Sequence, residues 1–293
     1  MRMLAKVGCK VKTESISQHM KEVELFMGEI MGAGSTIAKW MDAFDVMRKN
    51  DVRPVVIHCP LYKNKILSIE ILLNNSLKRE VLDFFMFAEV VRKLFNMDEI
   101  IVVFHADVAK KTLERLDVYG DLILEIEKLT WAYPNVVISL ENTMIFHRLG
   151  DEYEIGGTNI SNNIDIVKDL RKRDLNVFAT INTCHYISDY EITMKVLEPT
   201  TIKRPKTLVE IIQENHDVIN NYHLSKAYNN ALQRGHGAPI DCCNHSSVMG
   251  FLLAHSQLKL DNVPVVLEVW EEDNSRGDNF IMSKEILNNA LRR

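Results

Sequence analysis

Two stretches of this chain decide the expected fold: IIVVFH at residues 100–105 and VVISLE at residues 136–141. Each is a short, β-branched apolar run that ends in a polar residue, which is typical of a buried parallel strand. Similar runs recur along the chain, and polar residues with metal-ligand chemistry follow them at intervals of 36 to 47 residues. That interval corresponds to one strand plus one helix, so the sequence predicts a repeated βα unit.

Eight apolar runs can be counted, and segments with helical spacing lie between them. The runs are residues 4–11, 23–27, 55–57, 100–104, 136–140, 177–181, 221–224 and 263–269. The helical segments are residues 36–49, 68–95 with a break near 74–76, 163–173, 207–219 and 246–258. Strands that alternate with helices predict parallel pairing through right-handed crossovers.

Eight units in 293 residues favour an α/β fold that closes into a single (β/α)8 TIM barrel with outer helices. We expect residues 1–293 to form one domain. No glycine-rich phosphate loop follows the first strand, which disfavours an open doubly wound sheet. In a TIM barrel the chemistry takes place at the C-terminal rim, where the polar residues that follow the strands would meet.

Composition limits the partners and the cellular location. The net charge of −5 and the pI near 6.1 give no general attraction for polyanions, which disfavours nucleic acid as a partner. No apolar run approaches the roughly 20 residues that span a bilayer, and the start lacks a signal-peptide core. We therefore expect a soluble, cytoplasmic protein with no membrane segment. Residues 84–95 could form a homo-oligomer face, but a core-facing helix is the favoured interpretation.

The candidate site consists of polar residues that follow the strands. A barrel would aim Glu141, His223 and Glu268 at its axis, and this mixed oxygen and imidazole set suits Zn, Mn, Co or Mg. Such an ion polarises a carbonyl or an alkoxide while a free carboxylate oxygen moves a proton. One such residue alone is usually a solvated loop residue, but their recurrence at one end of successive units favours a functional site.

Six short strings carry a resemblance to a known group of proteins. They are HCPLY at residues 58–62, FHAD at 104–107, SLENT at 139–143, INTCHY at 181–186, YHL at 222–224 and VVLEV at 265–269. In this order they resemble the xylose-isomerase-like TIM-barrel superfamily. That superfamily contains sugar and sugar-phosphate isomerases and epimerases together with the zinc AP endonucleases of family 2.

The isomerase and epimerase branch implies a divalent metal ion and a small, sugar-like substrate. The resemblance implies that the metal ligands are Glu141, Asn182, His223 and Glu268. Glu141 and Glu268 would also be the catalytic acid and base that move a proton next to a carbonyl. The substrate would be positioned by His185, Arg234 and Lys226.

Asn182 departs from the pattern of the family, which has an aspartate at this position. An amide oxygen is neutral and a weaker ligand than a carboxylate, so we expect weaker metal binding here. Three consequences are open. A different ion is preferred, the metal binds only with substrate, or the chain is a non-catalytic barrel that binds a small ligand.

The AP endonuclease branch is the alternative enzyme. His58, His105 and Glu141 resemble the ligands of one zinc ion in that branch, and His185 and His236 would take part in a third zinc site. The presence of both His58 and His105 is more typical of the endonucleases, whereas the acidic net charge opposes a duplex-binding face. We favour the isomerase or epimerase. The long loop of residues 142–161 is either a lid over the site or a surface loop.

Overall fold

A computed structural model gives the fold of most of the chain. The residues that it describes are 1–8, 19–27, 33–59, 61–62, 65–66, 78–106, 118–143, 146–149, 152–155, 160–187, 190, 206–227, 236–243, 245–269 and 277–292.

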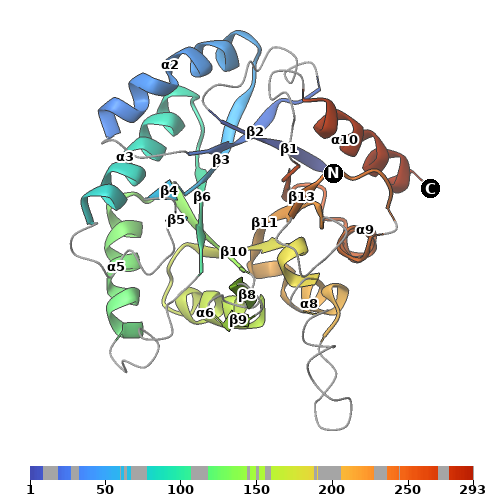
Figure 1. Ribbon diagram of the computed structural model, residues 1–293. Coiled ribbons are helices and arrows are strands. Elements are labelled where there is room, and N and C mark those ends of the chain that lie inside the picture. Colours follow the sequence, from blue (N-terminus) through green and yellow to red (C-terminus); the bar gives the residue numbers. More distant parts are fainter. Residues whose placement is uncertain are drawn as a thin grey trace.

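Eight parallel strands close into a barrel, and helices surround it (Figure 1). The barrel strands are β1 (Arg2–Val7), β2 (Glu22–Phe26), β3 (Arg53–His58), β6 (Ile100–His105), β7 (Val136–Glu141), β10 (Val177–Asn182), β11 (Ile219–Leu224) and β14 (Pro264–Leu267). They neighbour one another in chain order, and β14 pairs with β1 to close the ring. The predicted (β/α)8 TIM barrel is confirmed. The prediction of one domain over residues 1–293 stays a prediction.

The helices lie on the outside of the barrel. They are α2 (Ala33–Lys49), α3 (Lys78–Leu94), α5 (Val118–Ala132), α6 (Ile160–Arg171), α8 (Leu208–Asn215), the 3₁₀ turn η3 (His216–Val218), α9 (Ser246–Leu258) and α10 (Asp278–Leu291). The prediction of residues 246–258 matches α9 at both ends, and α2 and α6 match within three residues. The expected break near residues 74–76 lies outside the described residues.

The structure differs from the predicted elements at several places. The helix predicted over residues 207–219 ends at Asn215, because β11 begins at Ile219 after the η3 turn. Strand β1 spans residues 2–7, and the predicted continuation from residue 9 to 11 lies outside the described residues. Helices α5 and α10 were missed, although Ile123, Ile126 and Leu129 show the three-residue spacing of a buried helical face.

An aromatic cluster packs α2 and α3 against the barrel. The rings of Trp40 and Phe44 stack with centroids 5.8 Å apart, and Phe44 also contacts Phe87 at 6.1 Å and Phe95 at 5.7 Å. The consecutive Phe84 and Phe85 are fully buried and contact Phe104 on β6. Phe84, Phe85 and Phe87 therefore face the core, as the favoured interpretation expects, whereas Met86 is 47% exposed and a role of residues 84–95 in a homo-oligomer stays a prediction.

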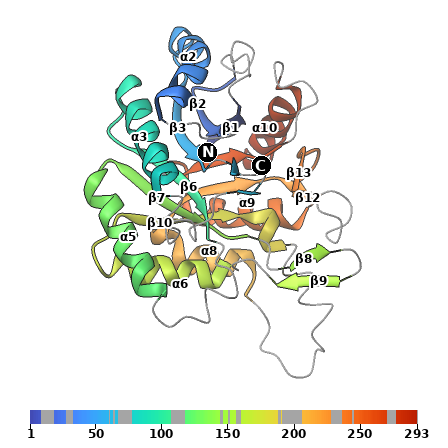
Figure 2. The same ribbon diagram turned by 60° about the vertical axis from the view of Figure 1, so that its left-hand side comes forward.

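Short antiparallel hairpins follow alternate barrel strands. The pair β4 (Leu61–Tyr62) and β5 (Lys65–Ile66) follows β3, the pair β8 (Phe146–Leu149) and β9 (Glu152–Ile155) follows β7, and the pair β12 (Lys226–Ala227) and β13 (His236–Ala238) follows β11. Figure 2 shows β8 and β9 side by side at the edge of the molecule. The loop predicted over residues 142–161 therefore contains a hairpin. Its role as a lid or as a surface feature stays a prediction.

No helix among the described residues is both long enough and apolar enough to cross a lipid bilayer.

Replacement of Phe44 by alanine tests the packing of the helices on the barrel. Because Phe44 is fully buried among other rings, we expect the Phe44→Ala variant to lose about 3–5 kcal/mol of unfolding free energy. The matched control is Trp131→Ala, because Trp131 is 80% exposed and its loss should change the unfolding free energy by about 0.5 kcal/mol or less. Chemical denaturation followed by circular dichroism measures both, and equal losses would contradict this account of the core.

Candidate metal centre

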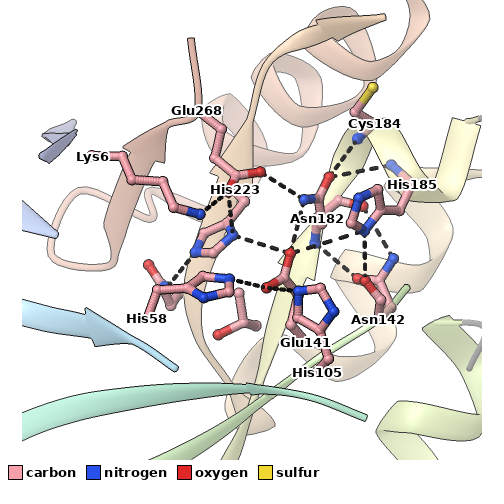
Figure 3. A network of polar contacts seen from close by, with 12 residues as sticks. Lys6, His58, His105, Glu141, Asn142, Asn182, Cys184, His185, His223 and Glu268 are labelled. Atoms are coloured by element: carbon pink, nitrogen blue, oxygen red, sulfur yellow. Dashed lines mark hydrogen bonds and ion pairs between the residues drawn. The ribbon is translucent and has the colours of Figure 1, made fainter. Parts of the chain in front are cut away.

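Every barrel strand contributes one polar side chain to a cluster at its C-terminal end. In strand order these residues are Lys6, Glu24, His58, His105, Glu141, Asn182, His223 and Glu268. Figure 3 shows most of these side chains pointing toward one another. Parallel strands in a closed barrel bring their carboxyl ends to one rim, which is why residues far apart in the sequence meet here.

The Glu141 carboxylate lies at the centre of this cluster and is 1% exposed. Its Oε1 atom lies 3.1 Å from Nδ1 of His223, and its Oε2 atom lies 3.1 Å from Nε2 of His58. His105 approaches Oε2 as well, with its Nε2 atom at 3.6 Å. Three imidazole rings from three strands therefore meet one buried carboxylate (Figure 3).

The outer contacts of two histidines set which ring nitrogen carries the proton. Nε2 of His223 lies 2.9 Å from Oε2 of Glu24, so it donates its N–H to that carboxylate; the Asn221 amide lies farther from the same nitrogen, at 3.2 Å. Nδ1 of His58 lies 3.1 Å from the Cys59 carbonyl, which can only accept. In the neutral rings, Nδ1 of His223 and Nε2 of His58 then carry lone pairs.

These two lone pairs point at the oxygens of Glu141, and neither partner has a proton to share. Such a contact is stable only if a proton or a metal cation lies between the atoms. Orientation of a histidine ligand by a carboxylate or a carbonyl on its other nitrogen is the usual arrangement around a bound metal ion.

Without an ion, protons supply the missing positive charge. Burial lowers the pKa of His223, but the charges of Glu141, Glu24 and Glu268 outweigh burial and hold this pKa well above its usual value. Burial raises the pKa of Glu141, but His223 and His105 outweigh it and hold the pKa well below its usual value. In the ion-free cluster a buried His223 imidazolium therefore pairs with buried carboxylates.

Four residues of the cluster fit one divalent ion. His58, Glu141, His223 and Glu268 each offer a ligand atom, and these four atoms all lie within 4.8 Å of one another. All four residues are buried. Two carboxylates and two imidazoles form a donor set that first-row transition metals accept. This set is the one group of its kind in the part of the chain that the structure describes.

Asn182 lies in the cluster, but its oxygen points away from the carboxylates. Its Oδ1 atom accepts hydrogen bonds from the backbone N–H groups of Cys184 at 3.1 Å and His185 at 3.2 Å, at the start of the helical residues 183–187. This is the position of a helix N-cap, which asparagine favours. Turning the amide over would aim its NH₂ group at two N–H donors, so Oδ1 is committed to the cap.

The Asn182 amide nitrogen bridges the two glutamates. Nδ2 donates to Oε1 of Glu141 and to Oε2 of Glu268, both at 2.8 Å. The amide therefore fixes the spacing of the two carboxylates (Figure 3). A role for Asn182 as a metal ligand stays a prediction, and in the orientation observed the side chain acts as a hydrogen-bond donor to the ligands.

The residues predicted to position a substrate differ in their placement. His185 is buried beside the cluster, where its Nδ1 atom lies 2.9 Å from the carbonyl of Asn142 and 3.9 Å from Oε1 of Glu141. The Lys226 ammonium donates to Asp241 at 2.6 Å, in an exposed contact of the β12 hairpin. His236 begins β13, and Arg234 lies outside the described residues.

Two charged members of the cluster were missed in the sequence. Lys6 and Glu24 are register partners on β1 and β2, and Glu24 is fully buried. The Lys6 ammonium forms an ion pair with Oε1 of Glu268 and lies 3.3 Å from Oε1 of Glu24. The available signal was one charged residue inside each otherwise apolar run, in MLAKV and VELF.

Known proteins resemble this chain in structure rather than in sequence. No protein-family model and no curated protein match the sequence. A structure described as a xylose isomerase domain protein from Planctomyces limnophilus matches with a TM-score of 0.63 at 10% identity, over 99% of this chain and 96% of that one. The chain shares its TIM-barrel fold with this structure.

Two further structures with this fold cover the same range. Endonuclease IV from Thermus thermophilus matches with a TM-score of 0.60 at 13% identity, over 99% of this chain and all of that one. The IOLI protein, solved with a bound zinc atom, matches with a TM-score of 0.63 at 12% identity, over 99% of this chain and 98% of that one. At these identities the likeness concerns the fold.

The network predicts how stability depends on pH in the ion-free protein. His223 has a raised pKa, so its stabilising contribution is complete below the unfolded value of 6.5 and declines as pH rises toward the folded value. Glu141 and Glu268 have lowered pKa values. Their stabilising contribution is therefore complete above the unfolded pKa of 4.5 and declines as pH falls below it. We expect the highest melting temperature between these two pH values.

Thermal unfolding in the presence of a chelator measures this profile. The His223→Gln variant has no imidazolium at this position, so we expect it to lose most of the decline above pH 6.5. Its decline at acidic pH should also become smaller, because the charge of His223 is a main cause of the lowered pKa of Glu141. An identical alkaline slope in the variant and the wild type would show that His223 is not the group responsible.

Proposed function

We propose that this protein is a divalent-metal-dependent isomerase or epimerase of a small sugar or a sugar-like hydroxy-ketone. One observation carries the proposal: two buried glutamates, Glu141 and Glu268, are held a fixed distance apart where the lone pairs of two histidines converge. A proton shift next to a carbonyl needs a carboxylate base and a positive charge on the neighbouring oxygens, and this cluster offers both.

Each group of the cluster has its own role in the proposed proton transfer. When bound, a divalent ion polarises the two oxygens of a hydroxy-ketone and stabilises the negative charge that develops on them. One glutamate, Glu268 or Glu141, removes the proton from the hydroxyl-bearing carbon next to the carbonyl. Isomerisation returns that proton to the former carbonyl carbon and moves the hydroxyl proton to the other oxygen, whereas epimerisation adds a proton from the other glutamate to the opposite face. Asn182 keeps the two carboxylates at a constant separation through its two hydrogen bonds of 2.8 Å.

Surrounding groups hold the ligands in place. Glu24 orients His223, and the Cys59 carbonyl orients His58. The Asn142 carbonyl accepts from Nδ1 of His185, which fixes the ring of the residue that we propose contacts substrate oxygens. With two imidazoles in the set, we propose Zn, Mn or Co in preference to Mg, which favours oxygen ligands.

Replacement of Glu268 by glutamine tests the proton transfer. In heavy water, NMR follows the incorporation of deuterium into a panel of pentoses, hexoses and their phosphates, with Mn²⁺, Co²⁺ or Zn²⁺ present. We expect the Glu268→Gln variant to lose exchange by at least about 100-fold, because an amide cannot take the proton. The Glu285→Gln variant on α10 is the matched control and should exchange at the rate of the wild type.

The same experiment separates the proposal from a non-catalytic role. Undiminished exchange in Glu268→Gln would remove this residue from the mechanism. Metal content measured on the same samples gives a second readout. Absence of a stoichiometric ion under every condition would favour a barrel that binds a small ligand without catalysis.

A phosphodiesterase that acts at abasic sites is the second candidate, and His105 is the observation that favours it. His58 and His105 both face Oε2 of Glu141, at 3.1 and 3.6 Å, which gives this oxygen the surroundings of a ligand to a second ion. Endonuclease IV shares the fold. Incubation with an oligonucleotide that carries one abasic site, with Zn²⁺ or Mn²⁺, tests this activity, and an intact strand on a denaturing gel would set it aside.

A further inference from the structure

Lys6 brings a permanent positive charge into the cluster that holds the candidate metal ligands. It lies near the end of β1, and its side chain is 18% exposed. Its ammonium donates to Oε1 of Glu268 (Figure 3). It also lies 3.3 Å from Oε1 of Glu24. None of the roles proposed above uses this residue.

The ammonium contacts the carboxylate oxygen that a metal ion would need. Oε2 of Glu268 already accepts a hydrogen bond from Asn182, whereas Oε1 faces Nδ1 of His223 at 3.3 Å. An ion held by His223 and Glu268 would therefore approach Oε1, where Lys6 lies. Two cations at one buried oxygen repel each other strongly, because the low-dielectric interior screens charges poorly.

Glu24 offers the ammonium a second position. Its Oε2 atom binds His223, whereas its Oε1 atom has the Lys6 ammonium at 3.3 Å but accepts no hydrogen bond from any residue that the structure describes. A buried carboxylate oxygen without a hydrogen bond is unfavourable, so a donor that moved closer to it would be stabilised there. A small movement of the Lys6 side chain from Glu268 toward Glu24 would satisfy this oxygen and release Oε1 of Glu268.

We propose that Lys6 is an internal cation that competes with the metal ion for Glu268. In the ion-free protein its charge neutralises the buried carboxylates. When a divalent ion enters, the ammonium moves to Glu24, and the ion takes its place at Glu268. This inference rests on the proposed metal site and adds to it a reason for weak, reversible loading, because each binding event must first displace a positive charge.

Metal titration of Lys6→Met tests the competition directly. Isothermal titration with Mn²⁺ and with Zn²⁺, on protein first stripped with a chelator, gives the dissociation constant without any assay of activity. We expect Lys6→Met to bind at least about tenfold more tightly than the wild type. The matched control is Lys21→Met, because Lys21 is exposed and pairs with Asp51 outside the cluster, and its affinity should equal that of the wild type.

Thermal unfolding of the same variants supplies an independent readout. Removal of Lys6 takes one of two positive charges away from the buried Glu24 and Glu268 and leaves only His223 beside them, so ion-free Lys6→Met should melt at a lower temperature than the wild type. Added Mn²⁺ should raise its melting temperature by more than it raises that of the wild type. Should Lys6→Met not fold, Lys6→Gln keeps a hydrogen-bond donor without the charge, and we expect it to bind metal more tightly as well.

The outcomes separate this inference from the proposed function. Tighter binding in the charge-removing variants, or binding only in those variants, supports the competition. Unchanged or weaker binding in them, with a wild type that binds metal, overturns the role of Lys6 and leaves the metal-dependent enzyme intact. Absence of metal binding in wild type and variants alike overturns both.

Discussion

The contact between the Glu141 carboxylate and the side chains around it is the constraint on which the site depends. The group is buried and ionised, so both of its oxygens need positive charge or N–H donors close by. His58, His223 and Asn182 supply these contacts from β3, β11 and β10. Each of these strands must therefore keep its register, because a shift by one residue would turn the polar side chain away from the barrel interior.

Most of the fold could be predicted from the sequence because most strands are short apolar runs, and those of β3, β6, β7 and β14 are rich in β-branched residues. The eight runs correspond to the eight barrel strands, and the ends of α9 were predicted to the residue. The boundary between α8 and β11 was less accurate, since Ile211, Ile212 and Val218 continue a helical pattern into the turn. Apolar periodicity cannot locate a change of backbone direction inside a continuous apolar segment.

Most residues of the buried cluster were named from the sequence, but Lys6, Glu24 and the contacts within the cluster were not. Residues that follow a strand, such as Glu141 and Glu268, are recognisable because the apolar run stops at them. Lys6 and Glu24 lie inside their apolar runs, where a single charged residue only weakens the prediction of a strand. Their common role becomes visible when β1 and β2 are paired, because the two residues are then neighbours. The orientation of Asn182 depends on two backbone N–H groups that follow it, and residue type alone does not specify that geometry.

The two ends of the Asn182 amide join parts of the protein that would otherwise be separate. One end anchors the helical residues 183–187, which carry His185, and the other touches both acidic side chains. A movement of the Glu141 and Glu268 carboxylates around an incoming molecule would therefore be transmitted through Asn182 to the backbone that carries His185. A single planar group thus couples the positions of the two carboxylates to the position of the His185 imidazole.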